Sequence, residues 1–352
     1  MIAPFIYSAT KVRVVFGAES FASLGIEAEL LGLERVLVIS TPGQSLLAHQ
    51  VASKLGMRCV GTCQHARMHV PIDAVKQALE QVHHLCIDGL VAIGGGSSIG
   101  LAKAVALKTE LPIIAIPTTY SGSEMTPIYG ITEHGVKKTG KASHVQPQVV
   151  IYDPDLTINL PRDVSITSGI NAIAHAVEGL YAKDTNPVVN LMAEEGIKAL
   201  AIGLPAVYSD PGDIEARTQC LYGAWLCGIV LGSVGMALHH KLCHTLGGSF
   251  NLPHAETHTA ILPHVIAYNR QAAPDSMQRI ARALGVDDPA CGIYDLAKNN
   301  GAKVSLQSIG MKEEDLDTAL QLALQNPYWN PQEVEFGPLE SLLRDAYNGD
   351  CP

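Results

Sequence analysis

The fold is decided by a stretch in the first half of the chain, GLVAIGGGSSIGLAKAVAL at residues 89–107. A continuous apolar run leads into three glycines and then into a helical pattern, and such a run predicts a strand buried on both faces. Three further runs, RVLVIS, LPIIAIP and QVVIYDP, lie at residues 35–40, 111–117 and 148–154. Apolar residues with helical spacing lie between the runs, as at residues 72–85. We therefore expect a parallel sheet covered by helices on both faces.

The pattern changes after Asp155, where long segments rich in Ala, Leu, Glu and His follow with helical period and without a convincing β-run. Two prolines within DPDLTINLP, residues 153–161, break the periodicity at this point. We predict two domains: an α/β nucleotide-binding domain at residues 1–157 and an all-α domain at residues 158–352, which carries a dense group of histidines.

Composition limits what the chain can bind. Among 352 residues the formal net charge is −10 and 16% of residues are charged, which argues against a nucleic-acid partner. A hydrophobic fraction of 47% excludes a disordered chain. The eight cysteines form no CxxC pair, so neither a zinc ribbon nor a secreted disulfide framework is expected. The N-terminus has no basic start followed by an apolar core, so we expect no export signal and a cytoplasmic protein.

A stretch without Asp, Glu, Lys or Arg, between Arg217 and Lys241, is about long enough to cross a bilayer. It contains four glycines, ends in two histidines and has neither a flanking basic cluster nor a second spanning candidate. We therefore predict a buried helix of the helical domain, whose glycines permit close packing, and no membrane partner.

The glycine loop after the strand at residues 89–93 has the chemistry of an anion cradle. Glycines let the backbone approach a pyrophosphate, serines offer hydroxyls, and the following helix presents N–H groups and the positive end of its dipole. The loop matches neither GxGxxG nor a Walker sequence, so the pattern alone does not name the ligand, and a tight turn with a structural role is the alternative. The residues of the cradle are Gly94, Gly95, Gly96, Ser97 and Ser98.

A second loop, PTTYSGSEMTP at residues 117–127, follows the next predicted strand in the same way. Ligands of open α/β sheets bind beyond the carboxyl ends of the strands. We therefore expect the polar side chains of this second loop to face the same crevice as the glycines. These side chains are Thr118, Thr119, Tyr120 and Ser121.

Six histidines crowd the segment HHKLCHTLGGSFNLPHAETHTAILPH, between His239 and His264. His240 and His244 are four residues apart and share a helix face, and His254 follows a Gly-Gly turn that can fold the chain back beside them. His175 lies four residues after an asparagine in GINAIAHAVE. Such histidines bind a metal, act as general acids or pair with an anionic substrate, and a buried hydrogen-bonded core histidine is the alternative for any one of them.

Together these motifs resemble the iron-containing alcohol dehydrogenase superfamily, whose fold joins a nucleotide-binding α/β domain to a helical domain and is dehydroquinate synthase-like. The resemblance covers nearly the whole chain, through GGGSSIGLAK, GSEMT, GINAIAHAVE and the histidine-rich segment. It implies metal-ligand positions at Asn171, His175, His240 and His254. The superfamily has an aspartate where Asn171 stands, and a neutral amide adds no negative charge to hold a divalent cation. We therefore expect no bound metal.

The segments PTTYSGSEMTP, HHKLCH, PHAETHT and NPYWNP make the chain similar to a branch that reduces a carbon–carbon double bond of a small dicarboxylate with NADH or NADPH, in bacterial breakdown of aromatic rings. The resemblance implies that the cofactor pyrophosphate lies at the glycine loop. The implied nicotinamide-side and ribose contacts are Thr118, Thr119, Ser121 and Lys137. Thr41 stands where many relatives carry an aspartate that repels the phosphate of NADPH, so we expect both cofactors to be accepted.

For such a substrate the histidines take over the role of the metal. A chain of net charge −10 repels a dianion unless its pocket is locally positive, and the histidines with the adjacent Lys241 supply that charge. Hydride transfer leaves an enolate, and we expect His175, His240 and His254 to donate hydrogen bonds to its oxygen. His244 is our candidate for the acid that protonates the enolate carbon.

Three alternatives stay open on the sequence. The first is a metal-dependent alcohol dehydrogenase acting on a small alcohol, with Asn171 as a tolerated ligand. The second is a catalytically silent nucleotide or metal sensor. The third is a sugar-phosphate cyclase, which requires tight zinc and more basic residues. The expected assembly is a homodimer, because two-fold dimers are the commonest symmetric oligomers.

Overall fold

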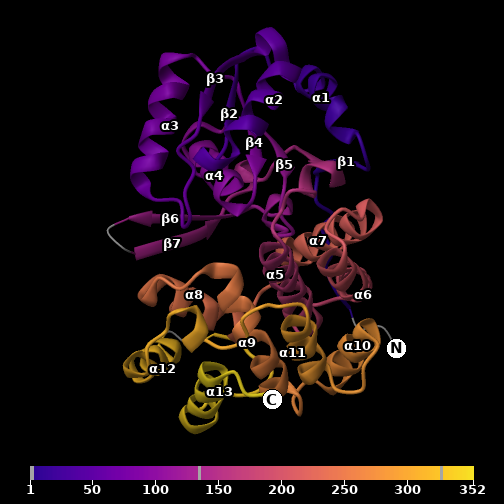
Figure 1. The fold of residues 1–352 in the computed structure, drawn as a ribbon. Coiled ribbons are helices and arrows are strands. Elements are labelled where there is room, and N and C mark those ends of the chain that lie inside the picture. Colours follow the sequence, from indigo (N-terminus) through magenta and orange to yellow (C-terminus); the bar gives the residue numbers. More distant parts are fainter. Residues whose placement is uncertain (1–3, 134–135, 326–327) are drawn as a thin grey trace. The chain divides into compact units, whose positions relative to one another are not determined.

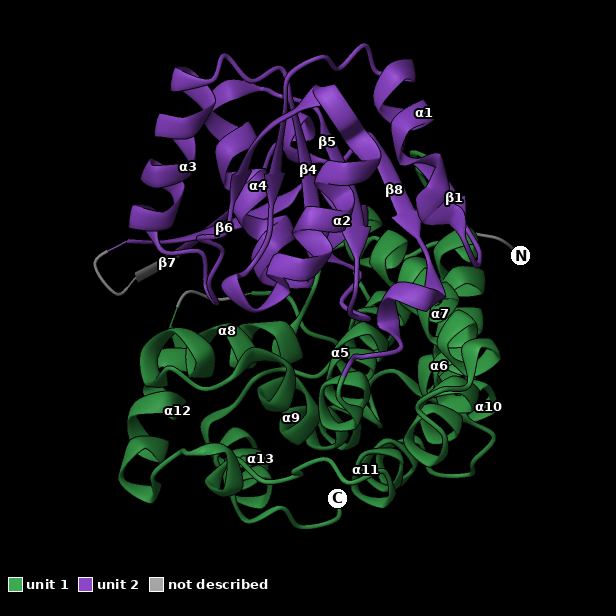
Figure 2. Ribbon diagram, turned by 45° about the horizontal axis from the view of Figure 1, so that its top comes forward, with its two compact units in different colours: residues 1–9, 161–352 green, residues 10–160 purple. Residues whose placement is uncertain are grey.

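The structure is a computed structural model that describes residues 4–133, 136–325 and 328–352. It forms two compact units, coloured separately in Figure 2: one contains residues 10–160, and the other contains residues 161–352 with the N-terminal residues up to Ala9. The predicted boundary after residue 157 lies three residues before this one. Hydrophobic patterning does not reveal that the N-terminal residues belong with the helical unit.

The unit of residues 10–160 is built on a parallel sheet with the strand order β1-β8-β5-β4-β2-β3 (Figure 1). The predicted strands are confirmed as β2 (Val36–Ile39), β4 (Gly89–Gly94), β5 (Ile113–Pro117) and β8 (Val149–Tyr152). The two edge strands, β1 (Arg13–Phe16) and β3 (Cys59–Cys63), were not predicted. Edge strands are only partly buried here, so they lack the continuous apolar run that marks a central strand of a parallel sheet.

Helices cover both faces of this sheet. They are α1 (Leu24–Leu30), α2 (Ser45–Leu55), α3 (Ile72–His84) and α4 (Gly96–Thr109). On one face, Val36 and Val38 of β2 share a core with side chains of α1 and α2 such as Leu24 and Val51. The intervening Leu37 lies on the other face, close to Leu85 at the end of α3. Burial on both faces explains why the central strands read as unbroken apolar runs.

An antiparallel hairpin follows β5 and completes this unit. Its strands are β6 (Ile128–Glu133) and β7 (Val136–Lys141). Lys137, the implied ribose contact, therefore lies in β7, whereas β6 was not predicted as a strand. Thr132 of β6 pairs with Lys137 of β7. The residues between the two strands lie outside the described ranges.

Lys103 of α4 ties the segment before this hairpin to the sheet. Its Nζ donates to the carbonyl oxygens of Ser123 at 2.5 Å, Thr126 at 2.8 Å and Ile128 at 3.0 Å. Burial lowers the pKa of Lys103 to about 7, and the nearby Glu124 carboxylate opposes that shift. The ammonium form has three N–H donors, one for each of these carbonyl oxygens, whereas a neutral amine has two, so the full set of hydrogen bonds requires the charged form.

The second unit is all-helical over its described residues, as predicted. Its helices are α5 (Arg162–Leu180), α6 (Pro187–Ser209), α7 (Ile214–Ser233), α8 (Leu238–Phe250), α9 (His254–Asn269), α10 (Pro274–Leu284), α11 (Pro289–Asn299), α12 (Leu316–Leu324) and α13 (Phe336–Asn348). Helix α5 contacts α6, α7 and α9 and is buried from Ser165 to its end. Helices α6 and α7 approach closely, because a Cβ added at Gly223 would lie 2.9 Å from the carbonyl oxygen of Gly196.

The uncharged stretch forms two helices, so the prediction of one buried helix was wrong. Helix α7 ends at Ser233, and α8 begins at Leu238 with an axis bent by 97° from that of α7. The turn between them contains Gly235, whose N–H donates to Asp184 Oδ1 at 2.9 Å. Taken one at a time, none of the described helices has both the length and the apolarity for a membrane span, and this bent pair meets the criterion only jointly.

We expect Lys103→Met to lower the free energy of unfolding by about 3 kcal/mol, because it leaves buried carbonyl oxygens without their donor. Urea denaturation of the two proteins measures the difference. Lys108→Met is the matched control, since Lys108 lies on the same helix with an exposed side chain. Equal stability of the two variants would show that Lys103 does not hold the segment.

Candidate active site

Helix α5 contributes three polar side chains to one face of the helical unit. Asn171, His175 and Glu178 follow one another at four- and three-residue spacing, which places them on the same side of a helix. Each is at most 5% exposed, and Glu178 is fully buried. Buried polar groups require hydrogen-bond partners, so the element that packs against this face of α5 must supply donors and acceptors to these side chains.

Glu178 caps the first turn of α8. Its Oε2 accepts the backbone N–H of Ala237 at 2.8 Å, and its Oε1 accepts that of His239 at 2.7 Å. The residue before α8 provides no side-chain cap, so a carboxylate from another helix takes that place. Negative charge is also favoured at a helix N-terminus by the helix dipole.

The same carboxylate begins a chain of hydrogen bonds through two histidines. Glu178 Oε2 lies 2.7 Å from Nδ1 of His240, and Nε2 of His240 lies 2.8 Å from Nδ1 of His175. A carboxylate only accepts, so Nδ1 of His240 carries a hydrogen. In the neutral ring Nε2 of His240 then carries the lone pair, and Nδ1 of His175 donates to it. Both ring nitrogens of His240 are engaged within the protein.

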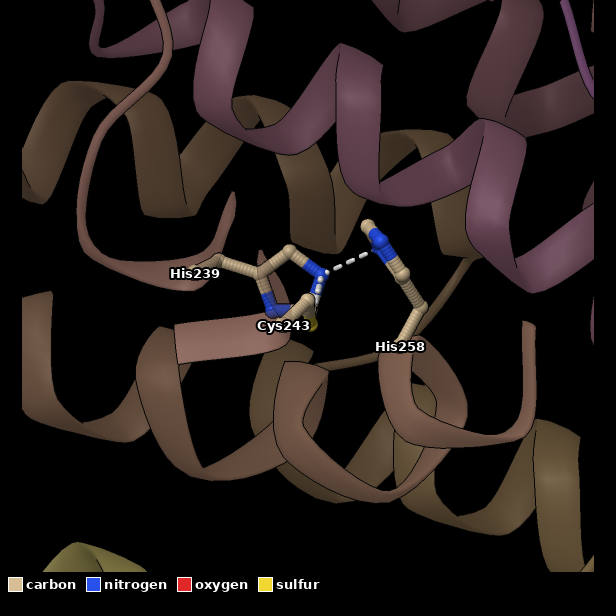
Figure 3. A group of neighbouring side chains, drawn as sticks. All are labelled: His239, Cys243 and His258. Carbon is tan, nitrogen blue, oxygen red and sulfur yellow. Dashed lines mark hydrogen bonds between the residues drawn. The ribbon is translucent and has the colours of Figure 1, made fainter. Parts of the chain in front are cut away.

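A second histidine pair, His239 and His258, is drawn in Figure 3. It lies beside the first, with the ring centroids of His240 and His258 5.1 Å apart. His239 Nε2 is 2.8 Å from His258 Nδ1 and 3.7 Å from Cys243 Sγ, and all three side chains are fully buried. Burial lowers the pKa of His239 and of His258 well below the usual histidine value, and the neighbouring histidines lower both further. Burial also raises the pKa of the Cys243 thiol well above its usual value. These groups are therefore neutral at neutral pH.

The implied metal positions do not fit a metal ion as they are arranged. Ligands at metal–nitrogen distances near 2.1 Å place their donor atoms within about 4.2 Å of one another. Among the described residues, the trio of His, Cys or acidic side chains with donor atoms within 4.8 Å of one another is His239, Cys243 and His258, not His175, His240 and His254. Instead, Nδ1 of His175 and Nε2 of His240 form a hydrogen bond with each other.

The buried trio is a poor metal site for a different reason. The thiolate form of Cys243 is disfavoured by burial, and the two imidazoles already share a hydrogen bond.

Asn171, at the position of the missing carboxylate, has its Oδ1 buried without a hydrogen-bond partner in the described part of the chain. Such an orphaned acceptor indicates that a water or a ligand completes the site.

The other predicted residues border this cluster. His254 is the first residue of α9 and is half-buried, with its ring centroid 4.5 Å from that of His258. His244 is exposed on α8, with its ring 6.2 Å from that of His240. Lys241 is half-buried and its Nζ lies 5.5 Å from the centre of the Tyr328 ring.

Three residues of this histidine cluster, Glu178, His239 and His258, were not predicted to have a role. Both histidines belong to the dense segment, so their presence was visible but not their pairing. The signal for Glu178 was a charged residue one turn after His175, in a part of α5 that has no other charged residue after Asp163. His264, also in the dense segment, is buried, and burial lowers its pKa to about 4.

The glycine loop in the α/β unit is shaped by close contacts at its first residue. Gly94 has φ +134°, and a Cβ there would lie 2.2 Å from Gln44 Oε1 and 2.6 Å from Ser98 Oγ. Helix α4 begins at Gly96 without a side-chain cap, and Ser98 Oγ is buried without a partner among the described residues. An uncapped helix N-terminus with an orphaned hydroxyl fits a phosphate group.

Gln44 connects the loops that follow three neighbouring strands. Its Nε2 donates to Thr118 Oγ1 at 2.9 Å, and Thr41 Oγ1 donates to Gln44 Oε1 at 3.3 Å. Thr119 also lies against the loop, since a Cβ at Gly95 would be 2.8 Å from its Cγ2. The structure thus brings Thr41, Thr118 and Thr119 to the glycine loop. Gln44 was not predicted, because nothing in the local pattern distinguishes it.

The remaining predicted cofactor residues are less closely tied to this loop. Ser121 Oγ donates to Glu124 Oε2 at 3.4 Å, and Tyr120 is fully buried. Ser97 is the second residue of α4. Lys137 lies in β7, and its side chain is outside the described part of the chain, as are the first two residues of NPYWNP.

Comparison with known proteins gives one family over nearly the whole chain. Models described as "Iron-containing alcohol dehydrogenase" and "Fe-containing alcohol dehydrogenase family, C-terminal" match residues 11–154 and 165–347. A maleylacetate reductase of Pseudomonas sp. (strain P51) is 57% identical over 99% of each chain. The crystal structure of maleylacetate reductase from Agrobacterium tumefaciens has a TM-score of 0.96 and 49% identity over 100% of each chain.

A crystal structure of an iron-containing alcohol dehydrogenase from Corynebacterium glutamicum is 41% identical, with a TM-score of 0.94 over 99% of this chain and 98% of that one. These matches agree with the fold, a parallel α/β unit joined in sequence to a helical unit. The chain is therefore an oxidoreductase that belongs to the iron-containing alcohol dehydrogenase family.

Proposed function

We propose that this enzyme reduces the carbon–carbon double bond of maleylacetate to give 3-oxoadipate, with NADH or NADPH as the reductant. The observation that carries the proposal is the 57% identity, over 99% of both chains, with a protein named maleylacetate reductase. A second relative of that name, from Burkholderia cepacia, is 54% identical over the same share. The reaction would serve the bacterial breakdown of aromatic rings.

The nicotinamide cofactor is assigned to the loops of the α/β unit. Gly94, Gly95, Gly96, Ser97 and Ser98 would hold its pyrophosphate, supported by the uncapped start of α4 and the orphaned Ser98 hydroxyl. Thr118, Thr119 and Ser121 would contact the nicotinamide side, and Lys137 the ribose. Bound reduced nicotinamide supplies the hydride that adds to the alkene carbon β to the ketone.

We assign to the histidine cluster the stabilisation of the negative charge that develops on the substrate. Addition of hydride leaves an enolate, whose oxygen is stabilised by hydrogen-bond donors placed in advance. His175 and His254 are our direct donors. His240 acts through His175, because its two ring nitrogens already bond to Glu178 and His175. His244, exposed one turn from His240, is our acid for the enolate carbon.

The dicarboxylate substrate needs positive charge close by, because the chain as a whole carries −10. Lys241 is the lysine of α8 that adjoins the cluster in sequence, and we assign it to this role together with His244 and His254. No step in this scheme passes through a metal, since His175 and His240 are hydrogen-bonded to each other and, among the described residues, His254 does not complete a three-ligand cluster with them.

A metal-dependent alcohol dehydrogenase acting on a small alcohol is the second candidate. It is favoured by the 41% identity with a protein named iron-containing alcohol dehydrogenase. In that case Asn171 would be a ligand despite its neutral amide. The homodimer and the cytoplasmic location stay predictions in either case.

We expect the purified enzyme to oxidise NADH and NADPH on addition of maleylacetate at a rate that chelator treatment leaves unchanged. The measurement follows nicotinamide absorbance before and after EDTA, with metal analysis of the same sample. Complete loss of turnover with EDTA, restored by a divalent cation, would instead favour the alcohol dehydrogenase.

We expect His254→Ala to lower kcat about 100-fold and to change KM for maleylacetate by less than about threefold, because an oxyanion donor acts mainly in the transition state. Steady-state kinetics measure both constants. His84→Ala on α3, which removes an exposed histidine, is the control and should match the parent enzyme. An unchanged kcat for His254→Ala would remove His254 from the mechanism.

We expect Thr41→Asp to lower kcat/KM with NADPH about tenfold or more while that with NADH changes little, because a carboxylate there repels the extra phosphate. Thr41→Asn is the neutral control of similar size. Equal losses with the two cofactors would place Thr41 away from the ribose phosphate.

A further inference from the structure

Glu178 is a buried carboxylate whose ion-pair partner, in the described part of the chain, is a histidine. Its side chain is fully buried, and it accepts hydrogen bonds from three backbone N–H groups at the start of α8, those of Ala237, His239 and His240, and from Nδ1 of His240. A cap for α8 accounts for the backbone bonds. It does not account for the 2.7 Å contact with the imidazole.

The carboxylate decides which nitrogen of each imidazole carries hydrogen. With the opposite tautomer of a neutral His240, two acceptors, Oε2 and Nδ1, would face each other at 2.7 Å, which is repulsive. The hydrogen on Nδ1 leaves Nε2 of His240 as an acceptor. That acceptor favours the form of His175 in which Nδ1 carries a hydrogen and donates it to His240. Glu178 therefore controls His175 from two hydrogen bonds away.

We propose that Glu178 is a positioning residue for the reduction: through His240 it fixes the ring orientation and the hydrogen placement of His175. The inference rests on the proposed function, in which His175 contacts the enolate oxygen. With Nδ1 of His175 directed at His240, Nε2 is the ring nitrogen of His175 that His240 does not engage.

Glu178→Gln tests the proposal with little change in shape. The amide still accepts a backbone N–H but carries no charge and no longer enforces the His240 tautomer. We expect kcat to fall by about 10- to 100-fold and KM for maleylacetate and for NADH to change by less than about threefold. Asp213→Asn, which alters the side-chain cap of α7, is the matched control and should leave kcat unchanged.

A double-mutant cycle separates positioning from capping. If Glu178 acts through His240, Glu178→Gln should change kcat by less than about twofold in a His240→Gln background. If it only caps α8, the loss should be the same in both backgrounds, and that result would overturn the proposal.

A spectroscopic measurement tests the tautomer independently of activity. In nitrogen-15 histidine-labelled enzyme without substrate or cofactor, the ring signals of His240, assigned by their absence in His240→Gln, should show hydrogen on Nδ1. In Glu178→Gln this pattern should change. An Nε2–H tautomer of His240 in the parent enzyme would refute the inference. Absence of activity on maleylacetate, with the predicted tautomer present, would instead count against the proposed function alone.

Discussion

The candidate site depends on one buried carboxylate held between two helices. Glu178 of α5 bonds to the first backbone N–H groups of α8 and to His240 within that helix. A buried charge is tolerated only where hydrogen bonds and opposite partial charges surround it, and a helix N-terminus supplies both. The position of α8, and with it the placement of His239, His240 and His244, therefore follows from a residue some sixty positions earlier in the chain.

The exchange of a carboxylate for Asn171 changes the electrostatics of this site. An aspartate there would add a second negative charge on the same face of α5 as Glu178, and a cation would be needed to balance the pair. With the amide, one carboxylate, hydrogen-bonded to the start of α8 and to His240, remains on this face. In the proposed function, imidazoles rather than a metal then stabilise the enolate oxygen.

Much of the fold could be predicted from hydrophobic patterning. The central strands β2, β4, β5 and β8 are buried on both faces and read as unbroken apolar runs. The edge strands β1 and β3 and the hairpin strand β6 are partly exposed, so their patterns are weak. In the site, the dense histidines were visible in the sequence. Glu178 and Gln44 were not, because each gains its meaning from partners distant in the chain.

The break between α7 and α8 shows why local rules failed where they did. Periodicity alone runs through Ser233 to Leu238 without a polar signal, and no residue before α8 offers a side-chain cap, so one long helix was the reasonable prediction. A helix that starts without its own cap needs an acceptor from elsewhere, and here that acceptor is also the hydrogen-bond partner of the His240 imidazole. Departures from local sequence rules are expected at functional sites, where stability of one element is coupled to the geometry of another. A helix start that lacks its own cap and carries two adjacent histidines therefore indicates a functional site, because both the cap and the imidazoles require a buried acceptor from another element.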